Sequence, residues 1–199
     1  MTLRIRQNLV TAVLMTAVTT LLLGVAYPLV VTALSQALLR DKANGQIVER
    51  EGRAVGSRVL GQAFASPGYF HPRPSAAGSG YDAASSGGTN LGPTNKKLIE
   101  AVAAAVKTAR MENAEVPVPI DLVTSSASGL DPHLSPAAAL FQVPRVAKAR
   151  GLGEDLVRAL VEQHIEGRQI GFLGEPRVNV LVLNLALDDQ SAHEALSHR

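Results

Sequence analysis

Residues 9–31 read "LVTAVLMTAVTTLLLGVAYPLVV", an apolar stretch inside a longer interval, between Arg6 and Arg40, that carries no formal charge. A helix that crosses a bilayer needs about 20 mainly apolar residues, so this stretch is long enough to span it. A cleaved signal peptide is the alternative, because Arg4 and Arg6 form a short basic start, but its apolar region is normally about 7–15 residues long. The sequence therefore predicts a retained transmembrane helix over residues 9–36.

Small side chains recur at every fourth position of this segment. Ala12, Thr16, Thr20 and Gly24 fall on one stripe of a helix, and in membranes such stripes let helices approach closely and form hydroxyl hydrogen bonds. This pattern predicts packing on another membrane helix. The alternative is a lone anchor whose threonines hydrogen-bond to their own backbone. Pro28 predicts a kink near the outer end.

Basic residues flank the segment on both sides. Arg4 and Arg6 lie in the N-terminal tail, residues 1–8, and a larger number follow the helix: Arg40, Lys42, Arg50, Arg53 and Arg58. The positive-inside rule applies to short loops, whereas long domains cross largely regardless of their charge. We therefore expect a single-pass protein of the plasma (inner) membrane, with a cytoplasmic tail and its main domain outside.

The composition excludes several classes of function. The chain has 199 residues with no cysteine and no tryptophan, and its formal net charge is +2. Without cysteine there is no disulfide framework and no thiolate chemistry. Because no basic stripe is interleaved with aromatic residues, we expect no nucleic acid as a partner. The apolar segment makes membrane lipid an expected partner.

The chain after the membrane segment has the pattern of one α+β domain. A charged connector covers 37–53, the domain covers 54–188, and the polar tail 189–199 is expected to be flexible. Branched apolar residues predict a short strand within 55–64 and a buried strand over 178–187. The order of elements indicates about three helices on a small sheet.

Helical patterns occupy three segments of this domain. They run from Lys96 to about Met111, from Ser135 to a stop before Gly151 with a bend or break near Pro144, and from Glu154 to about Ile165. Thr94 or Asn95 would cap the first helix. The proline-rich segment 116–124 is typical of an extended edge segment, because proline cannot donate to a central ladder.

A long loop, residues 66–95, holds much of the glycine, proline and serine of the chain. Irregular connections of this length are usually functional or flexible. Tyr69, Phe70 and Tyr81 lie within it, which indicates packing against something rather than a plain linker. The loop ends in "SSGGTNLGPTNKK" (residues 85–97), whose glycines and lysines make it a candidate phosphate loop.

That stretch fails the known phosphate-binding patterns. A Walker loop closes with Gly-Lys-Ser/Thr, but Pro93, Thr94 and Asn95 separate Gly92 from Lys96. A dinucleotide fingerprint fails too, since no strand directly precedes three suitably spaced glycines. What remains is the helix N-terminus near Lys96, a general anion site, and a Ser86-Gly87-Gly88 run that also occurs in the transporter signature that contacts ATP.

Two further clusters have the residue types of an active site without its spacing. Ser126, Ser128, Asp131 and His133 lack the nucleophile elbow of a serine hydrolase. A metal site from His71, Asp82, Asp131 and His133 has no supporting ligand spacing. Asp131-Pro132 is instead typical of a turn whose carboxylate accepts hydrogen bonds from neighbouring amides. No metal and no firmly bound cofactor is expected.

Five separated motifs, in order and over nearly the whole chain, give a specific resemblance. They are "YFHPRPSA" (69–76), "SSGGTNLGPTN" (85–95), "SGLDPHLSP" (128–136), "RVAKARGL" (145–152) and "FLGEPRVNVLVLNLAL" (172–187). Together they closely resemble the C subunit of the Kdp-type potassium-transporting ATPase. Position 89 is threonine where that family more often has serine, which keeps the hydroxyl group.

The resemblance implies a non-catalytic accessory subunit, often described as a catalytic chaperone. Its partners would be a potassium-translocating, channel-like subunit and an ATP-hydrolysing subunit, whose affinity for ATP it would raise. On that account the candidates for nucleotide contact are Ser86, Gly87, Gly88 and Gln142. The loop residues expected to dock on a partner are Tyr69, Phe70, Asn90, Asn95, Asp131 and His133.

The predicted topology leaves two readings of this role. ATP is inside the cell, so a domain outside can affect ATP affinity only by coupling through the membrane helices. The first reading is therefore an assembly subunit that acts indirectly. The alternative is a nucleotide-binding chaperone that contacts ATP directly, together with the ATPase subunit.

Overall fold

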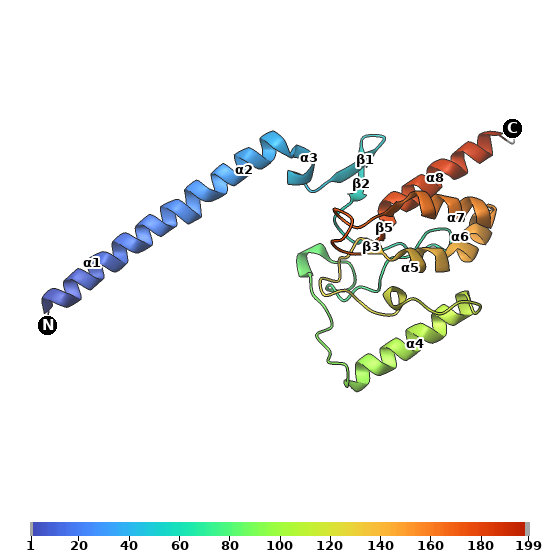
Figure 1. Ribbon diagram of the computed structural model, residues 1–199, viewed down its shortest axis with the longest axis horizontal. Coiled ribbons are helices and arrows are strands. Elements are labelled where there is room, and N and C mark those ends of the chain that lie inside the picture. The colour runs from blue at the N-terminus through green and yellow to red at the C-terminus, as the bar shows by residue number, and fades with distance from the viewer. Residues whose placement is uncertain (1, 198–199) are drawn as a thin grey trace. The chain divides into compact units, whose positions relative to one another are not determined.

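The computed structural model describes residues 2–197 and divides the chain into two compact units, residues 1–47 and 48–199. The first unit is a long helical segment with a short turn after it (Figure 1). The segment consists of α1 (Thr2–Thr19), a π-helical stretch η1 (Thr20–Ala26) and α2 (Tyr27–Leu38), and the short α3 (Arg40–Ala43) follows. Pro28 lies in the first turn of α2. The change in helical hydrogen bonding therefore lies next to the position where proline removes an amide donor.

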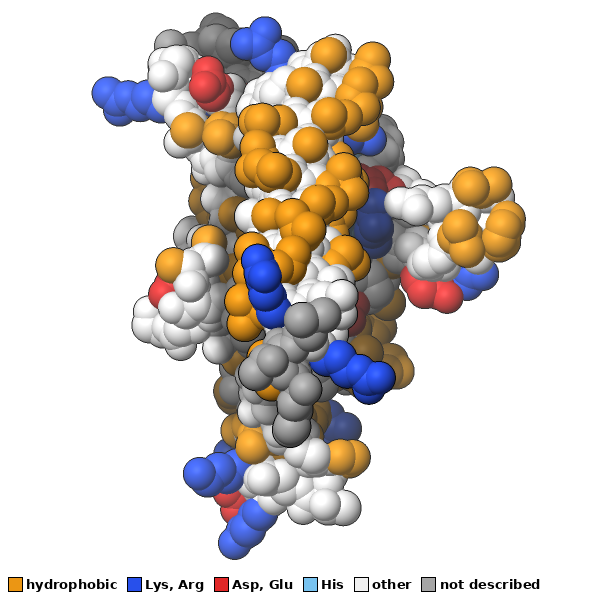
Figure 2. All heavy atoms as spheres, turned by 90° about the vertical axis from the view of Figure 1, so that its left-hand side faces the viewer, with side chains coloured by type: hydrophobic (Ala, Val, Ile, Leu, Met, Phe, Trp, Pro, Cys, Tyr) orange, Lys and Arg blue, Asp and Glu red, His pale blue; other side chains and the backbone are white. Residues whose placement is uncertain are grey.

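The long helix meets the requirements of a membrane span. Arg4–Leu38, 35 residues, is the one helix among the described residues that is long and apolar enough to cross a bilayer, and none of it is buried within the chain. Figure 2 looks onto this helix, along which hydrophobic side chains gather. Exposed leucine, valine and methionine on all sides of one helix need an apolar surrounding, which lipid or a partner helix supplies.

The second unit, which we call the folded unit (residues 48–199), has a single core of aliphatic side chains. It brings together α5 (Pro136–Phe141), α6 (Val143–Arg150), α7 (Glu154–Gln163) and α8 (Val180–Ser197). Phe70 of the long loop enters this core completely, beside Val143, Val161 and Leu183. The predicted bend near Pro144 is confirmed as a break at Gln142, and Gly151 ends α6 in a left-handed conformation.

Two small sheets accompany the helices. One pairs β1 (Ile47–Arg50) with β2 (Arg53–Ser57), and the other has the order β3 (His133–Leu134), β5 (Arg177–Asn179), β4 (Ile165–Glu166). In the second sheet both pairs are antiparallel, with Val178 opposite Leu134 on one side and Ile165 on the other. The α+β class predicted from the sequence is therefore confirmed.

The remaining helix, α4 (Lys96–Glu112), runs along the edge of the folded unit (Figure 1). Asn95 caps it, because its side-chain oxygen accepts a hydrogen bond from the amide of Lys97 at 2.9 Å. The predicted cap is thus resolved in favour of Asn95 over Thr94. Two short 3-10 turns, η2 (Ala83–Ser85) and η3 (Ile120–Leu122), complete the elements of the described chain.

The buried strand predicted over residues 178–187 is confirmed only for Val178 and Asn179, and from Val180 onward the prediction was wrong. The strand ends at Asn179, and residues from Val180 onward form α8, which continues to Ser197 where a frayed tail had been expected. Asn179 caps this helix through a hydrogen bond from the Val182 amide at 3.2 Å. The run reads as a strand because both helix faces are apolar, so the period of a helix is hidden.

Two further predictions of extended structure were also too long. Within 55–64, only residues up to Ser57 belong to a strand. Segment 116–124 contains the η3 turn and no strand among its described residues. Its prolines remove the amide donors that a ladder would need.

Candidate functional site

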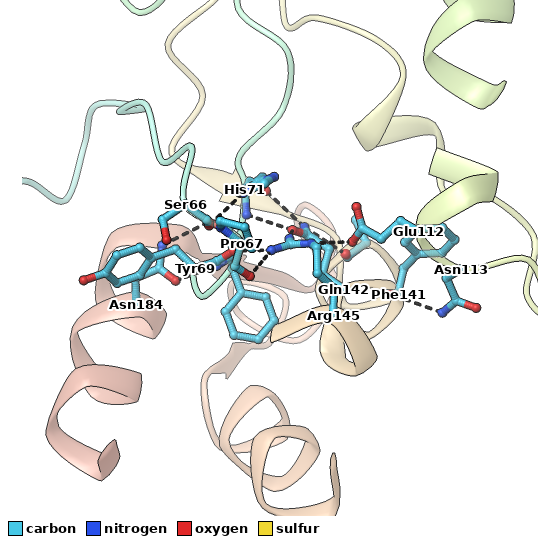
Figure 3. Close-up of polar contacts among 12 residues, drawn as sticks. Ser66, Pro67, Tyr69, His71, Glu112, Asn113, Phe141, Gln142, Arg145 and Asn184 are labelled. Carbon is cyan, nitrogen blue, oxygen red and sulfur yellow. Dashed lines mark hydrogen bonds and ion pairs between the residues drawn. The ribbon is translucent and has the colours of Figure 1, made fainter. Parts of the chain in front are cut away.

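Two amide side chains hold the long loop against the helices (Figure 3). Asn184 of α8 accepts a hydrogen bond from the Phe70 amide at 2.8 Å and donates one to the Phe70 carbonyl at 3.0 Å. Likewise, the Gln142 side chain accepts a hydrogen bond from the His71 amide at 2.8 Å and donates one to the His71 carbonyl at 3.0 Å. Two successive peptide units thus receive the paired hydrogen bonds that a neighbouring strand would otherwise give. Both amide side chains are almost completely buried.

Two arginines fix the preceding turn of this loop. Arg145 donates to the carbonyl oxygens of Pro67 and Tyr69 at 2.5 and 2.9 Å and forms an ion pair with Glu112 at 2.8 Å. Arg150 donates to the Gly68 carbonyl at 2.7 Å, and its guanidinium carbon lies 4.5 Å from the centre of the Tyr69 ring. Planar guanidinium groups suit this multiple binding of carbonyls and rings.

A second polar cluster joins the loop to the "SGLDPHLSP" segment. Asp131 pairs with Arg73 at 3.2 Å and accepts the amide hydrogen bond of His133 at 3.0 Å. Burial of Asp131 favours a higher pKa, but hydrogen bonds from His133 and Arg73, with the Arg73 charge, outweigh it and hold the pKa below its usual value. The expected turn, in which the carboxylate accepts hydrogen bonds from neighbouring groups, is confirmed.

Small residues let two loops lie in contact. The Gly87 amide and the Ser86 hydroxyl both donate to the Ser128 carbonyl, at 2.9 and 3.0 Å. A Cβ at Gly88 would lie 3.0 Å from the Ala127 carbonyl, and one at Gly129 would lie 2.7 Å from the Gly87 carbonyl. Gly129 also has a φ of +67°, which only glycine adopts freely. These glycines therefore serve close backbone packing.

The residues predicted for nucleotide contact belong to two different networks. The hydrogen bonds of Ser86 and Gly87 end on Ser128, whereas those of Gln142 end on His71, Ala138 and Arg145. Gln142 is only 2% exposed. Nucleotide contact at Gln142 would require its internal hydrogen bonds to break, whereas Ser86 is exposed.

The predicted docking residues differ in what they offer a partner. Phe70 is a core residue, because its side chain is completely buried. Asn90 is exposed and has a left-handed φ of +52°. Asn95 serves as a helix cap. Tyr69 is half-buried, and its hydroxyl lies 3.2 Å from Asp188.

The other clusters considered from the sequence do not assemble into sites. His133 is directed to Asp131, at 3.5 Å between Nδ1 and Oδ1, while the hydroxyls of Ser126 and Ser128 contact each other at 3.3 Å. Asp82 accepts the Ala84 amide hydrogen bond. Within the described residues, no three histidine or acidic side chains gather as metal ligands would.

The stripe of small residues is not covered by other parts of the described chain. The whole segment from Arg4 to Leu38 is unburied, and a Cβ at Gly24 would meet only Thr20 of the same helix, at 3.8 Å. Thr19, which lies off the stripe, donates to the Met15 carbonyl at 2.7 Å. One threonine therefore bonds back to the helix, as the lone-anchor reading expects, and the stripe itself stays free to pack.

Sequence reasoning missed Asn184, Arg150 and Glu112 as organisers of the loop. Asn184 carried a usable signal, because a lone asparagine in an apolar run must find buried partners. The two charged residues carried none, since their partners are more than 30 residues away in the chain. Only the tertiary structure reveals these contacts.

Comparison with known proteins shows the family to which the chain belongs. A family model described as "K+-transporting ATPase, c chain" matches residues 9–189. A potassium-transporting ATPase KdpC subunit of Koribacter versatilis is 61% identical, covering 92% of this chain and 95% of the relative. Subunits of the same name are 55% identical in Rhodospirillum rubrum (90% and 94% covered) and 56% identical in Myxococcus xanthus (89% and 86% covered). The chain therefore belongs to the KdpC family, the c chain of potassium-transporting ATPases, and is a membrane-associated subunit of a multi-subunit pump.

Proposed function

We propose that this chain is a non-catalytic accessory subunit of an ATP-driven potassium uptake pump. It promotes assembly with a channel-like, potassium-translocating subunit and raises the ATP affinity of the ATP-hydrolysing subunit by indirect coupling. The observation that carries the proposal is that Gln142 is buried, with its amide oxygen and its amide nitrogen both hydrogen-bonded to His71. A group held in this way supports the fold and is not available to a ligand.

The charge distribution supports an indirect effect. The candidate membrane span begins at Arg4, and the folded unit follows it as one large unit. Long domains translocate largely regardless of their charge, so the basic residues Arg4 and Arg6 in the short N-terminal tail carry more weight. They favour a cytoplasmic N-terminus and an outer folded unit. Such a unit cannot reach ATP, so its influence passes through differential contacts with the partner subunits in two states of the pump.

Two measurements on the intact pump test the proposal. Omitting this chain should reduce the yield of assembled pump, and it should raise the KM for ATP of any assembled remainder. Unchanged yield and KM would refute the accessory role.

Orientation and nucleotide contact need a second test. Protease added to intact spheroplasts should digest the folded unit, because it lies outside. A photoreactive ATP analogue should label the hydrolysing subunit and leave this chain unlabelled. Labelling of this chain at residues 86–88 or at Gln142 would instead support the alternative, a chaperone that binds nucleotide directly.

A further inference from the structure

A short hairpin between β4 and β5 presents apolar side chains outward. Gln169 and Leu173 exchange two backbone hydrogen bonds, both 2.9 Å long, so the intervening residues form a closed tip. Ile170, Phe172 and Leu173 are 82%, 69% and 48% exposed. We call Gln169–Leu173 the apolar tip. Three large apolar side chains on so small a turn are costly to leave in water.

The backbone of the apolar tip is held in an unfavourable conformation. Ile170 has a φ of +54°, and the adjacent Gly171 has a φ of +82°. A branched residue is rarely found in this left-handed region, where its Cβ crowds the backbone. Glycine or asparagine would be better suited there. Because the Ile170 side chain is 82% exposed, packing within the folded unit does not account for a branched residue at this position, and a contact outside the chain explains it best.

The charges beside the apolar tip indicate which surface it fits. Arg168 pairs with Glu175 at 2.5 Å, and Arg177 pairs with Glu166 at 2.9 Å. The base of the hairpin is therefore neutral. Segments that insert into anionic lipid usually carry unpaired basic residues. The apolar tip, closed by two backbone hydrogen bonds and flanked by paired charges, instead complements an uncharged apolar pocket of fixed shape. Its preorganised backbone reduces the entropy lost on binding.

We propose that the apolar tip docks into an uncharged apolar pocket on another protein subunit of the pump, with Phe172 and Ile170 as anchors. This inference rests on the proposed accessory function and adds the contact surface. A few side chains that fill well-packed, desolvated pockets usually dominate the energy of an interface, while the contacts around them mainly exclude water. Membrane lipid and a second copy of this chain are the competing occupants.

A cross-linking experiment distinguishes these occupants. The chain has no cysteine, so Phe172→Cys introduces a single thiol for a benzophenone label in the purified chain before reconstitution with its pump. Irradiation should join the label to another pump subunit. Cross-links mainly to lipid or to a second copy of the chain would overturn the proposal.

Two substitutions test the energy of the contact. Ile170→Gly removes an anchor and relieves the backbone, so the chain should unfold at the same or a higher temperature while its recovery with the pump falls about tenfold. Phe172→Ser should lower recovery by a similar factor. Unchanged recovery for both variants would contradict the docking role.

Ile120→Ser is the matched control. Ile120 is 71% exposed, in the η3 turn, and is equally costly to leave in water. Its replacement should leave recovery unchanged, which separates specific docking from a general effect of surface hydrophobicity. A loss equal to that of Phe172→Ser would overturn the proposal. If omission of the whole chain impairs assembly but the tip variants do not, only the docking inference fails and the accessory function stands.

Discussion

The helices α4 and α8 have nearly the same length, 17 and 18 residues, but very different attachments to the folded unit. α8 buries Val180, Leu181, Leu183 and Leu187 in the core, together with Asn184. Within the described chain, no residue of α4 is buried. An ion pair between Glu112 and Arg145 ties its last turn, and a pocket of about 310 Å³ lies beneath it. α8 is thus part of the core, whereas α4 is a partly covered flap.

The largest difference should come from removing one leucine from each helix. Leu183→Ala should lower the free energy of unfolding by about 2–5 kcal/mol, because it leaves a cavity in a close-packed core. Leu98→Ala, on the half-buried face of α4, should cost about 1 kcal/mol or less. Urea unfolding of the full chain in detergent measures both. Equal losses would show that α4 is as firmly packed as α8.

The loop clamp should give the next largest effect. Gln142→Leu keeps the approximate volume of the side chain but removes both hydrogen bonds to His71 and the bond to Arg145. Unpaired backbone groups next to the core should cost about 2–3 kcal/mol in total. Thermal unfolding of the full chain measures the loss. If the variant kept normal stability but raised the KM of the pump for ATP, Gln142 would contribute to nucleotide binding and not to the stability of the fold.

The same contrast explains what could be read from the sequence. α4 was predicted with nearly correct ends, because its apolar residues recur with a helical period and the opposite face is polar. α8 was mistaken for a strand, because a helix enclosed on most sides loses that polar face. Asn179, which caps α8, was the local signal that would have corrected the assignment. A clear amphipathic pattern therefore marked the less buried helix.

The candidate site was predictable only where its chemistry is local. The turn at Asp131 and the cap at Asn95 depend on neighbouring amides, so the sequence sufficed. The clamp that Asn184 and Arg145 place on residues 67–71 joins segments more than 70 positions apart. No spacing rule connects such residues, since the fold alone brings them together.

A smaller and more local effect should follow from loosening the flap. Glu112→Gln weakens the ion pair with Arg145, whose two partners are largely shielded from water. Amide hydrogen exchange in α4 should accelerate about fivefold, equivalent to about 1 kcal/mol, while α8 is unaffected. Glu100→Gln is the matched control, because its pair with Lys96 at 3.7 Å is exposed and contributes little. Equal acceleration by both variants would show that Glu112 does not hold the flap.

The smallest effect should be a dependence of stability on mild acid through His71, which lines the pocket under α4. Burial, and next the Arg145 charge, lower the pKa of His71 more than the Ser66 carbonyl and Glu112 raise it. The unfolded chain therefore binds a proton at a higher pH than the folded chain does. Stability from this group is fully present above about pH 6.5 and is lost as the pH falls from there toward the lower, folded pKa.

Urea unfolding between pH 7.5 and 5 measures this loss, and the same series on His71→Gln shows which part of it belongs to His71. If the flap opens separately, exchange in α4, corrected for the intrinsic effect of pH, should rise in acid before that in α8. This order follows because opening α4 exposes the His71 ring to water and so relieves the burial that is the main cause of its lowered pKa. An identical acid response in wild type and His71→Gln would show that His71 does not cause the loss of stability in acid.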